Sequence, residues 1–291
     1  MFEGSLVAVV TPMKSNGEID YESFKNLVEW HVHNSTDGLV VLGTTGESPT
    51  ITPNERTRII RQVVNQVNGK IPVIVGTGTY STNYSIELTQ QAMALGADAA
   101  LLVAPYYNKP TQEGLFQHFK SIAKAVSIPQ ILYNVPSRTI SDILPETILR
   151  LTKYHNIVGV KEASGDIERI TQLLQATHQL DLLSGDDKTA TNFMLAGGKG
   201  VISVVANIVP KRSHLWCMAA VSGNAKLARQ YDKELSPLYN TLFIESNPIP
   251  TKWALSQMNM ISDVMRLPLM SLSQKYHDNV RQALRQVGIK I

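Results

Sequence analysis

The feature that most constrains the fold is a series of eight short, nearly continuous apolar runs. They are Ser5–Val10, Gly38–Leu42, Pro72–Val75, Ala99–Val103, Gln130–Tyr133, Ile157–Val160, Leu180–Leu183 and Gly200–Val205. Strands buried on both faces, as in a parallel sheet, have this continuous pattern, whereas half-exposed strands alternate apolar and polar residues. Each parallel strand is reached by a crossover, usually a helix, so we expect helices between the runs.

The gaps between these runs carry helical patterns with recognisable ends. The predicted helices are Tyr21–Val32, Asn54–Val67, Ser81–Leu95, Gln112–Val126, Pro145–Tyr154, Asp166–Ala176 and Lys188–Leu195. Thr52 followed by Glu55 predicts a capping box, and Gly96 suits the position just after a helix. Alternation of this number and length predicts an α/β fold, the (β/α)8 or TIM barrel. The alternative is a doubly wound sheet, which often carries a glycine fingerprint after its first strand, where this chain has Thr11-Pro12.

The last part of the chain changes character, because no strand pattern follows Val209. Four further helices are predicted there: Lys211–Val221, Asn224–Phe243, Pro250–Met258 and Gln274–Val287. No Ser/Gly-rich linker separates them from the barrel. We therefore predict a barrel carrying the active site over residues 1–223 and a C-terminal helical layer packed on it over 224–291.

Composition removes several classes of function. The chain has 27 Lys and Arg against 24 Asp and Glu without a dense basic cluster, so nucleic acid is not an expected partner. The single cysteine, Cys217, permits no intrachain disulfide and no Cys-rich metal site. No apolar run approaches the length of a membrane span, and Glu3 stands where a signal peptide has basic residues, which predicts a cytoplasmic protein without a membrane partner. None of the seven histidines closes a predicted strand, so we expect no metal and no cofactor.

Catalytic groups in a (β/α)8 barrel lie at the C-terminal ends of the strands, where this chain places several reactive side chains. The second strand runs into Gly43–Glu47 (GTTGE), whose hydroxyls and backbone N–H groups suit a small carboxylate or phosphate, although a plain glycine-rich turn also explains it. The fourth strand leads to Tyr107, and the fifth ends in Tyr133. Arg138 follows shortly, with the planar fork that binds carboxylates, although a single arginine is more often a plain surface residue.

The sixth strand ends in Lys161, which is a costly residue in that position. Burial disfavours the charged form of lysine, and a desolvated lysine is a nucleophilic amine that can form a Schiff base with a carbonyl. The alternative is that Lys161 extends from the barrel rim into solvent. The hydroxyl and phenol groups expected on the same rim favour the nucleophile.

Several motifs together resemble the dihydrodipicolinate synthase family, within the pyruvate-dependent class I aldolases that include N-acetylneuraminate lyase. They are Gly43–Glu47, Tyr133–Thr139 (YNVPSRT), Gly159–Glu162 (GVKE) and Asn247–Pro250 (NPIP), and the resemblance covers essentially the whole chain. It implies condensation of pyruvate with L-aspartate 4-semialdehyde to 4-hydroxy-tetrahydrodipicolinate, the first committed step of diaminopimelate and lysine biosynthesis. It also implies a homotetramer built as a dimer of dimers.

The resemblance implies catalytic roles for four residues. Lys161 would attack the ketone of pyruvate and form an imine. Tyr133 would carry protons to and from the imine and the enamine. Thr44 would link Tyr133 to Tyr107, which in this family comes from the neighbouring subunit.

The resemblance also implies how the substrates are held. Thr45 and backbone N–H groups of its loop would bind the pyruvate carboxylate, and Arg138 would bind the carboxylate of aspartate semialdehyde. Gly185 and the backbone of Ile202 would lie close to the imine.

Three other functions compete with this one. Another pyruvate aldolase, acting on N-acetylneuraminate or a 2-keto-3-deoxy sugar acid, is the nearest, but the sialic-acid branch lacks an arginine at position 138. A catalytically dead sensor would be expected to lose Lys161 or Tyr133. A sugar-phosphate isomerase would need phosphate-binding glycines after strands seven and eight. Asp186 and Asp187 after strand seven would repel phosphate, and no glycine stands at Ala206-Asn207 after strand eight.

The chain departs from the family in two places. Ile140 stands where the family usually has glycine, which bears on the local turn. Lysine-inhibited members place polar and acidic residues where this chain has Pro53, Arg56, Tyr80 and Tyr84. Because Arg56 would repel an ammonium group and tyrosine supplies no carboxylate, we predict weak or absent inhibition by lysine.

Overall fold

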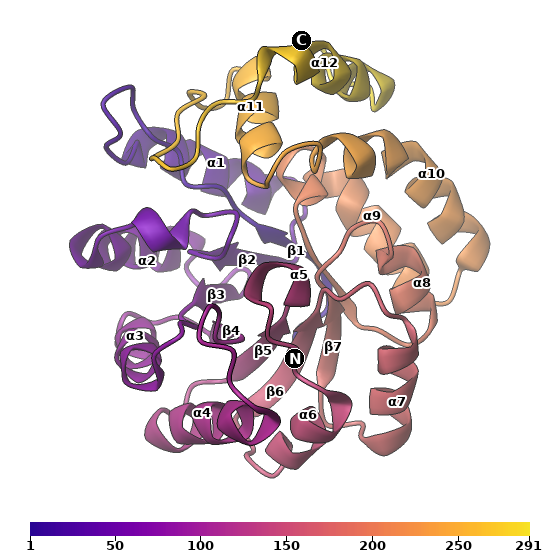
Figure 1. Cartoon of the computed structure of the whole chain (residues 1–291). Helices are drawn as coiled ribbons and strands as arrows, with labels where there is room; N and C mark the ends of the chain where they lie inside the picture. The colour runs from indigo at the N-terminus through magenta and orange to yellow at the C-terminus, as the bar shows by residue number, and fades with distance from the viewer.

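The computed structural model describes residues 1–291 and shows a closed parallel barrel, as predicted (Figure 1). Each strand pairs with its neighbours in chain order, and the eighth closes onto the first. The strands are β1 Gly4–Ala8, β2 Gly38–Val41, β3 Val73–Gly76, β4 Ala99–Val103, β5 Gln130–Asn134, β6 Ile157–Glu162, β7 Asp181–Ser184 and β8 Gly200–Ser203. All eight predicted runs are therefore strands, and no end shifts by more than two residues.

The predicted eighth strand was too long at its C-terminal end. The chain turns into a short 3-10 helix, η2 (Val205–Asn207), directly after β8. The buried Asp187 carboxylate accepts the backbone N–H groups of Val204 and Val205 at 2.9 and 3.1 Å. These N–H groups are therefore withdrawn from the sheet, although the side chains remain apolar.

Helices surround the barrel, and two of them end as the sequence predicts. They are α1 Tyr21–His33, α2 Pro53–Val67, α3 Thr82–Ala94, α4 Gln112–Ala125, α6 Pro145–Leu151, α7 Glu168–Ala176, α8 Ala190–Leu195 and α9 Pro210–Val221. The capping box of Thr52 and Glu55 is present, and Gly96 has a φ of 87°. The short helix α5 (Pro136–Thr139) was not predicted, and it lies directly after β5.

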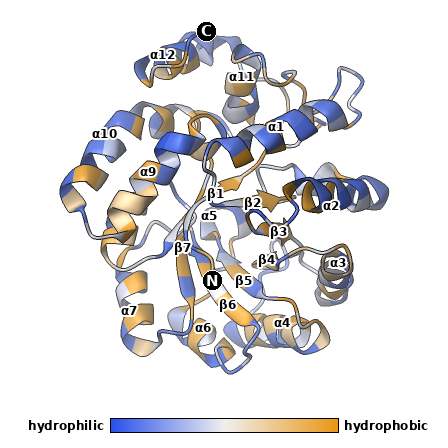
Figure 2. Ribbon diagram, turned by 180° about the vertical axis from the view of Figure 1, so that it is seen from behind, coloured by the Kyte–Doolittle hydropathy of each residue, from blue (hydrophilic) through white to orange (hydrophobic).

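The strands separate an inner core from an outer one. Side chains facing the barrel interior form one compact cluster, which Phe2 joins near the N-terminus: Phe2, Leu6, Ala8, Val40, Ile74, Ala99, Leu101, Ile131, Tyr133, Val135, Leu183 and Ile202. The opposite faces of the strands pack against the helices. Figure 2 shows hydrophobic colours along the strands and hydrophilic colours on the outer sides of helices such as α2. The interior is thus a packed core.

The C-terminal layer consists of α10 (Ala225–Thr241), α11 (Ile249–Gln257) and α12 (His277–Gln286), at the orange to yellow end of Figure 1. Helix α10 contacts α8, α9 and α12. Trp216 and Cys217 of α9 share one apolar cluster with Leu235 and Tyr239 of α10. We therefore propose that residues 224–291 are a layer that depends on the barrel for its core. None of the helices is both long and apolar enough to cross a membrane.

We predict that His31 makes the fold sensitive to acid. Burial lowers the pKa of His31 to about 3, so the folded state stays neutral there while the unfolded state gains a proton below about pH 6.5. Stability is therefore complete above pH 6.5 and falls as the pH falls, by about 2–3 kcal/mol between pH 6.5 and 4.5 for this group. The measurement is urea unfolding at several pH values for wild type and His31→Asn.

The variant is expected to lose part of the pH slope, whatever its stability at neutral pH. It keeps a hydrogen-bonding group near Thr36, whose hydroxyl lies 3.0 Å from His31 Nδ1. Some slope remains, because burial also lowers the pKa of His118, to about 4. Identical slopes in the two proteins would contradict the prediction.

Candidate active site

The candidate nucleophile and proton carrier lie side by side on adjacent strands. Tyr133 of β5 is the registered partner of Lys161 on β6, so the two side chains project to the same side, into the barrel. Both side chains are buried, each residue being only 6% exposed. Lys161 Nζ lies 4.1 Å from the centroid of the Tyr133 ring, and no ion pair engages Lys161. The structure therefore brings a buried amine and a phenol together at the C-terminal end of the barrel.

Gly185 makes room for this lysine. A Cβ atom at position 185 would lie 3.0 Å from Lys161 Cε and 2.7 Å from the Cβ of Ala163, closer than side chains pack. Ile202 of β8 is buried and belongs to the same interior cluster as Tyr133. Gly185 therefore borders Lys161, and Ile202 lines the barrel interior in the same cluster as Tyr133.

The loop after β2 presents Thr44 and Thr45 at the same rim. The backbone takes left-handed conformations at Leu42 and Glu47, with φ of 56° and 55°, which turn the chain sharply. The Thr45 hydroxyl is buried and accepts a hydrogen bond from Asn247 Nδ2 at 2.9 Å. No hydrogen bond joins Thr44 to Tyr133 within the subunit.

Arg138 and Tyr107 stand outside this buried group. Arg138 lies on α5, is exposed, and donates from Nη2 to the backbone carbonyl of Asn247 at 3.1 Å. Tyr107 is 92% exposed and has a left-handed φ of 74°. One subunit therefore brings Arg138 to the site through Asn247, whereas it leaves Tyr107 in solvent.

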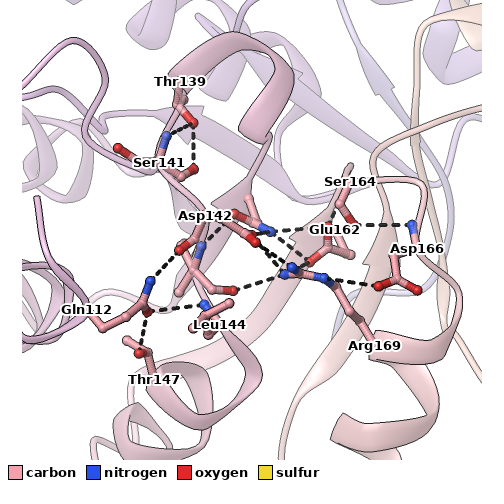
Figure 3. Close-up of polar contacts among 12 residues, drawn as sticks. Gln112, Thr139, Ser141, Asp142, Leu144, Thr147, Glu162, Ser164, Asp166 and Arg169 are labelled. Carbon is pink, nitrogen blue, oxygen red and sulfur yellow. Dashed lines mark hydrogen bonds and ion pairs between the residues drawn. The ribbon is translucent and has the colours of Figure 1, made fainter. Parts of the chain in front are cut away.

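The outward faces of β5 and β6 carry a polar network that supports the inward-facing pair (Figure 3). Asn134 Nδ2 donates to Asp142 Oδ1 at 2.9 Å and to Glu162 Oε2 at 3.1 Å. Arg169 of α7 donates to Asp142 Oδ1 at 2.9 Å, and its Nη1 lies 3.9 Å from Glu162 Oε2. Asn134 and Glu162 directly follow Tyr133 and Lys161, so this network holds the ends of the two strands that carry them.

A buried ion pair joins the threonine loop to the C-terminal layer. Lys252 of α11 lies 2.6 Å from Glu47 Oε1, and both side chains are almost fully shielded from solvent. Lys252 Nζ also donates to the Thr11 carbonyl at 3.0 Å, and the Arg266 N–H donates to Glu47 Oε2 at 3.3 Å. Burial lowers the pKa of Lys252, while the Glu47 carboxylate opposes that change.

Sequence reasoning missed Asn247, Thr251 and Lys252 as members of the site. Asn247 stood in a quoted motif, but its contact with Thr45 spans 202 positions. The one available signal was Lys252, a lysine next to the apolar residues Trp253, Ala254 and Leu255, which the structure buries. Elsewhere, no group of three or more His, Cys, Asp or Glu residues is placed to hold a metal ion.

Comparison with known proteins identifies the family. The sequence matches the model of the Dihydrodipicolinate synthetase family over residues 1–287. The chain belongs to this family. A relative in it, the 4-hydroxy-tetrahydrodipicolinate synthase of Coxiella burnetii, is 69% identical over 290 residues that cover 100% of both chains.

Solved structures of the family share the whole fold. The chloride-inhibited dihydrodipicolinate synthase of Acinetobacter baumannii, in complex with pyruvate, is 47% identical with a TM-score of 0.98 over 100% of both chains. A monomeric dihydrodipicolinate synthase variant is 44% identical with a TM-score of 0.97, covering 99% of this chain and 98% of that one.

We predict that neither charge of the Lys252–Glu47 ion pair can be removed alone, but that both can be replaced together by neutral side chains. Lys252→Met leaves the Glu47 carboxylate buried without its cation, which is expected to cost about 3–5 kcal/mol of unfolding free energy. Adding Glu47→Gln removes the unpaired charge and is expected to recover more than half of that loss. Urea unfolding of the single and double variants measures both values.

Glu113→Gln is the matched control, since Glu113 forms an exposed ion pair with Arg150 at 2.7 Å. Exposed pairs contribute about 1 kcal/mol or less, so the control should barely change stability. A double variant no more stable than Lys252→Met would show that the charge imbalance is not the cause.

Proposed function

We propose that Lys161 is the nucleophile through which this chain condenses pyruvate with L-aspartate 4-semialdehyde to 4-hydroxy-tetrahydrodipicolinate. The reaction is that of a 4-hydroxy-tetrahydrodipicolinate synthase, a Schiff-base-forming lyase of diaminopimelate and lysine biosynthesis. One observation carries the assignment of the nucleophile: a buried lysine without an ion pair lies against a buried tyrosine at the catalytic end of the barrel. Such biosynthesis leads us to propose a cytoplasmic location, which cell fractionation tests.

The chemistry follows from that amine. Lys161 adds to the ketone carbon of pyruvate, and loss of water gives an imine. Removal of a proton from the adjacent methyl group gives an enamine, whose carbon forms the new bond to the aldehyde. The amino group of the second substrate then attacks the imine carbon, closes the ring and releases Lys161.

Tyr133 is proposed to carry the protons in these steps. Its ring packs against the amine, and a phenol both donates and accepts protons, as general acid–base catalysis requires. Thr44 is proposed to connect Tyr133 to the partner subunit's tyrosine at position 107. Tyr133 and the partner's Tyr107 would then carry the protons through Thr44.

The substrate carboxylates are proposed to bind on either side of Asn247. Thr45 and the N–H groups of its loop would hold the carboxylate of pyruvate, with Gly185 and Ile202 shaping the space around the imine. The exposed fork of Arg138 would hold the carboxylate of the aldehyde. This clamp favours the four-carbon aldehyde over sugar-acid substrates, which need several hydroxyl contacts instead.

We predict that pyruvate becomes covalently attached to Lys161. Borohydride reduces the imine to a stable secondary amine, which peptide mass mapping locates. Lys161→Arg keeps a positive charge but provides no amine able to form this imine, and it is expected to lose both adduct and condensation activity. An adduct on another lysine would move the site, and no adduct on folded wild-type protein would overturn the Schiff-base mechanism.

We further propose that the active form is a homotetramer, a dimer of dimers in which each site receives Tyr107 from a neighbour. Tyr107 is exposed and has a left-handed backbone, so its ring projects from the subunit and is available to a neighbour. A monomeric member of the family keeps the fold, so the subunit's fold and its assembly are separate questions. Analytical ultracentrifugation measures the assembly directly.

We predict complementation between two inactive variants. Tyr107→Phe and Lys161→Ala are each expected to lose most activity, but mixed oligomers contain sites with an intact Lys161 and a partner's intact tyrosine. Co-expression with two affinity tags isolates these mixed oligomers. Activity no greater than the sum of the parents would contradict the sharing of Tyr107.

We predict weak or absent inhibition by lysine. Arg56 is buried and donates to Ser48 Oγ at 3.2 Å and to the Gly76 carbonyl. Burial lowers the pKa of Arg56 to about 10, so the guanidinium remains charged at neutral pH and repels an ammonium group. Tyr84 beside it adds no carboxylate. A lysine titration of the initial rate tests this, and strong inhibition at or below millimolar lysine would refute it.

A further inference from the structure

Asn247, in the segment before α11, contacts both proposed carboxylate anchors. Its side-chain Nδ2 donates to Thr45 Oγ1 at 2.9 Å, and its backbone carbonyl accepts from Arg138 Nη2 at 3.1 Å. Asn247 is 5% exposed, so both contacts start from a shielded position. We propose that Asn247 is a positioning residue that orients the Thr45 hydroxyl as a hydrogen-bond donor toward the carboxylate of pyruvate. This inference rests on the proposed function.

The direction of the hydrogen bonds follows from the donors and acceptors available. The fully buried Thr251 donates its hydroxyl to Asn247 Oδ1 at 3.1 Å. With Oδ1 engaged as an acceptor, the amide presents its NH2 group to Thr45. Thr45 Oγ1 accepts that bond, so its own proton remains for another acceptor. No other group of the protein hydrogen-bonds to this hydroxyl.

A carboxylate is the acceptor that such a hydroxyl suits. Charge-assisted hydrogen bonds are shorter and stronger than neutral ones, particularly where water is excluded. The chain from Thr251 through Asn247 to Thr45 therefore delivers a fixed donor to the site. Without the amide, the Thr45 hydroxyl would be free to rotate and its proton would not be committed to the substrate.

The two contacts of Asn247 can be separated experimentally. The contact with Thr45 uses the side chain, whereas the contact with Arg138 uses the backbone carbonyl and survives any side-chain replacement. A side chain that orients Thr45 affects pyruvate alone. A side chain that merely holds this segment in place would affect Arg138 as well, and therefore both substrates.

Asn247→Asp is the decisive variant. A carboxylate cannot donate to Thr45, so the Thr45 hydroxyl must donate to it and turn its proton away from pyruvate. We expect the KM for pyruvate to rise more than about tenfold, while the KM for aspartate semialdehyde changes less than about threefold. Steady-state kinetics with each substrate varied in turn gives both values.

Thr251→Val is the second variant, because it leaves Asn247 itself intact. Without the hydroxyl that holds Oδ1, the amide can rotate and present its oxygen to Thr45. We expect a rise of roughly threefold to tenfold in the KM for pyruvate alone. Ser256→Ala is the matched control on α11, since the Ser256 hydroxyl donates to the Trp253 carbonyl and to neither Thr45 nor Asn247. It is expected to leave both KM values unchanged.

Three results would overturn the inference while leaving the proposed function in place. One is an unchanged KM for pyruvate in Asn247→Asp. Another is an equal rise of both KM values together with a lower melting temperature. The third, decisive if Asn247→Asp fails to fold, is an unchanged KM for pyruvate in Thr251→Val. Borohydride trapping on the wild type is run in parallel, and a missing adduct there would overturn the proposed function itself.

Discussion

Closure of the parallel sheet is the constraint on which the rest of the structure depends. Because all eight strands run the same way, all their carboxyl ends meet at one rim, and side chains distant in sequence become neighbours there. The pairing of β5 with β6 then sets Tyr133 beside Lys161, and the absence of a side chain at Gly185 leaves the lysine its space. The reactive pair is thus a consequence of strand register, with little freedom left to individual loops.

The two faces of β5 and β6 carry different groups. Inward-facing Tyr133 and Lys161 form the buried amine–phenol pair, whereas the next residue on each strand faces outward into the network with Asp142 and Arg169. Alternation along a strand makes this division automatic. The ion pairs and hydrogen bonds that hold these two strands therefore lie outside the barrel interior, away from the buried pair.

The C-terminal layer belongs to the site as much as the barrel does. Lys252 neutralises Glu47 beneath the threonine loop, and Asn247 lies between Thr45 and Arg138. A buried ion pair adds little net stability compared with apolar packing, but one partner without the other is costly. The pair therefore fixes the position of the threonine loop relative to α11 more than it adds to stability. A barrel without residues 224–291 would lose the contacts that Asn247 and Lys252 make with Thr45, Arg138 and Glu47.

The amino-acid sequence by itself determined the barrel and the position of its main reactive groups. Continuous apolar runs mark strands wherever they occur, and Lys161, Tyr133 and Thr45 stand at the ends of such runs or a few residues beyond them. These signals are local, and hydrophobic burial acts on them in the same way in any context. Only the tertiary structure decided the C-terminal end of β8, where the Asp187 carboxylate accepts two N–H groups, and the exposure of Tyr107. It also decided the contacts of Asn247 and Lys252, which reach across 202 and 205 positions. Polar pairs of that separation leave no periodic trace in a sequence, because their partners meet only after the barrel has closed.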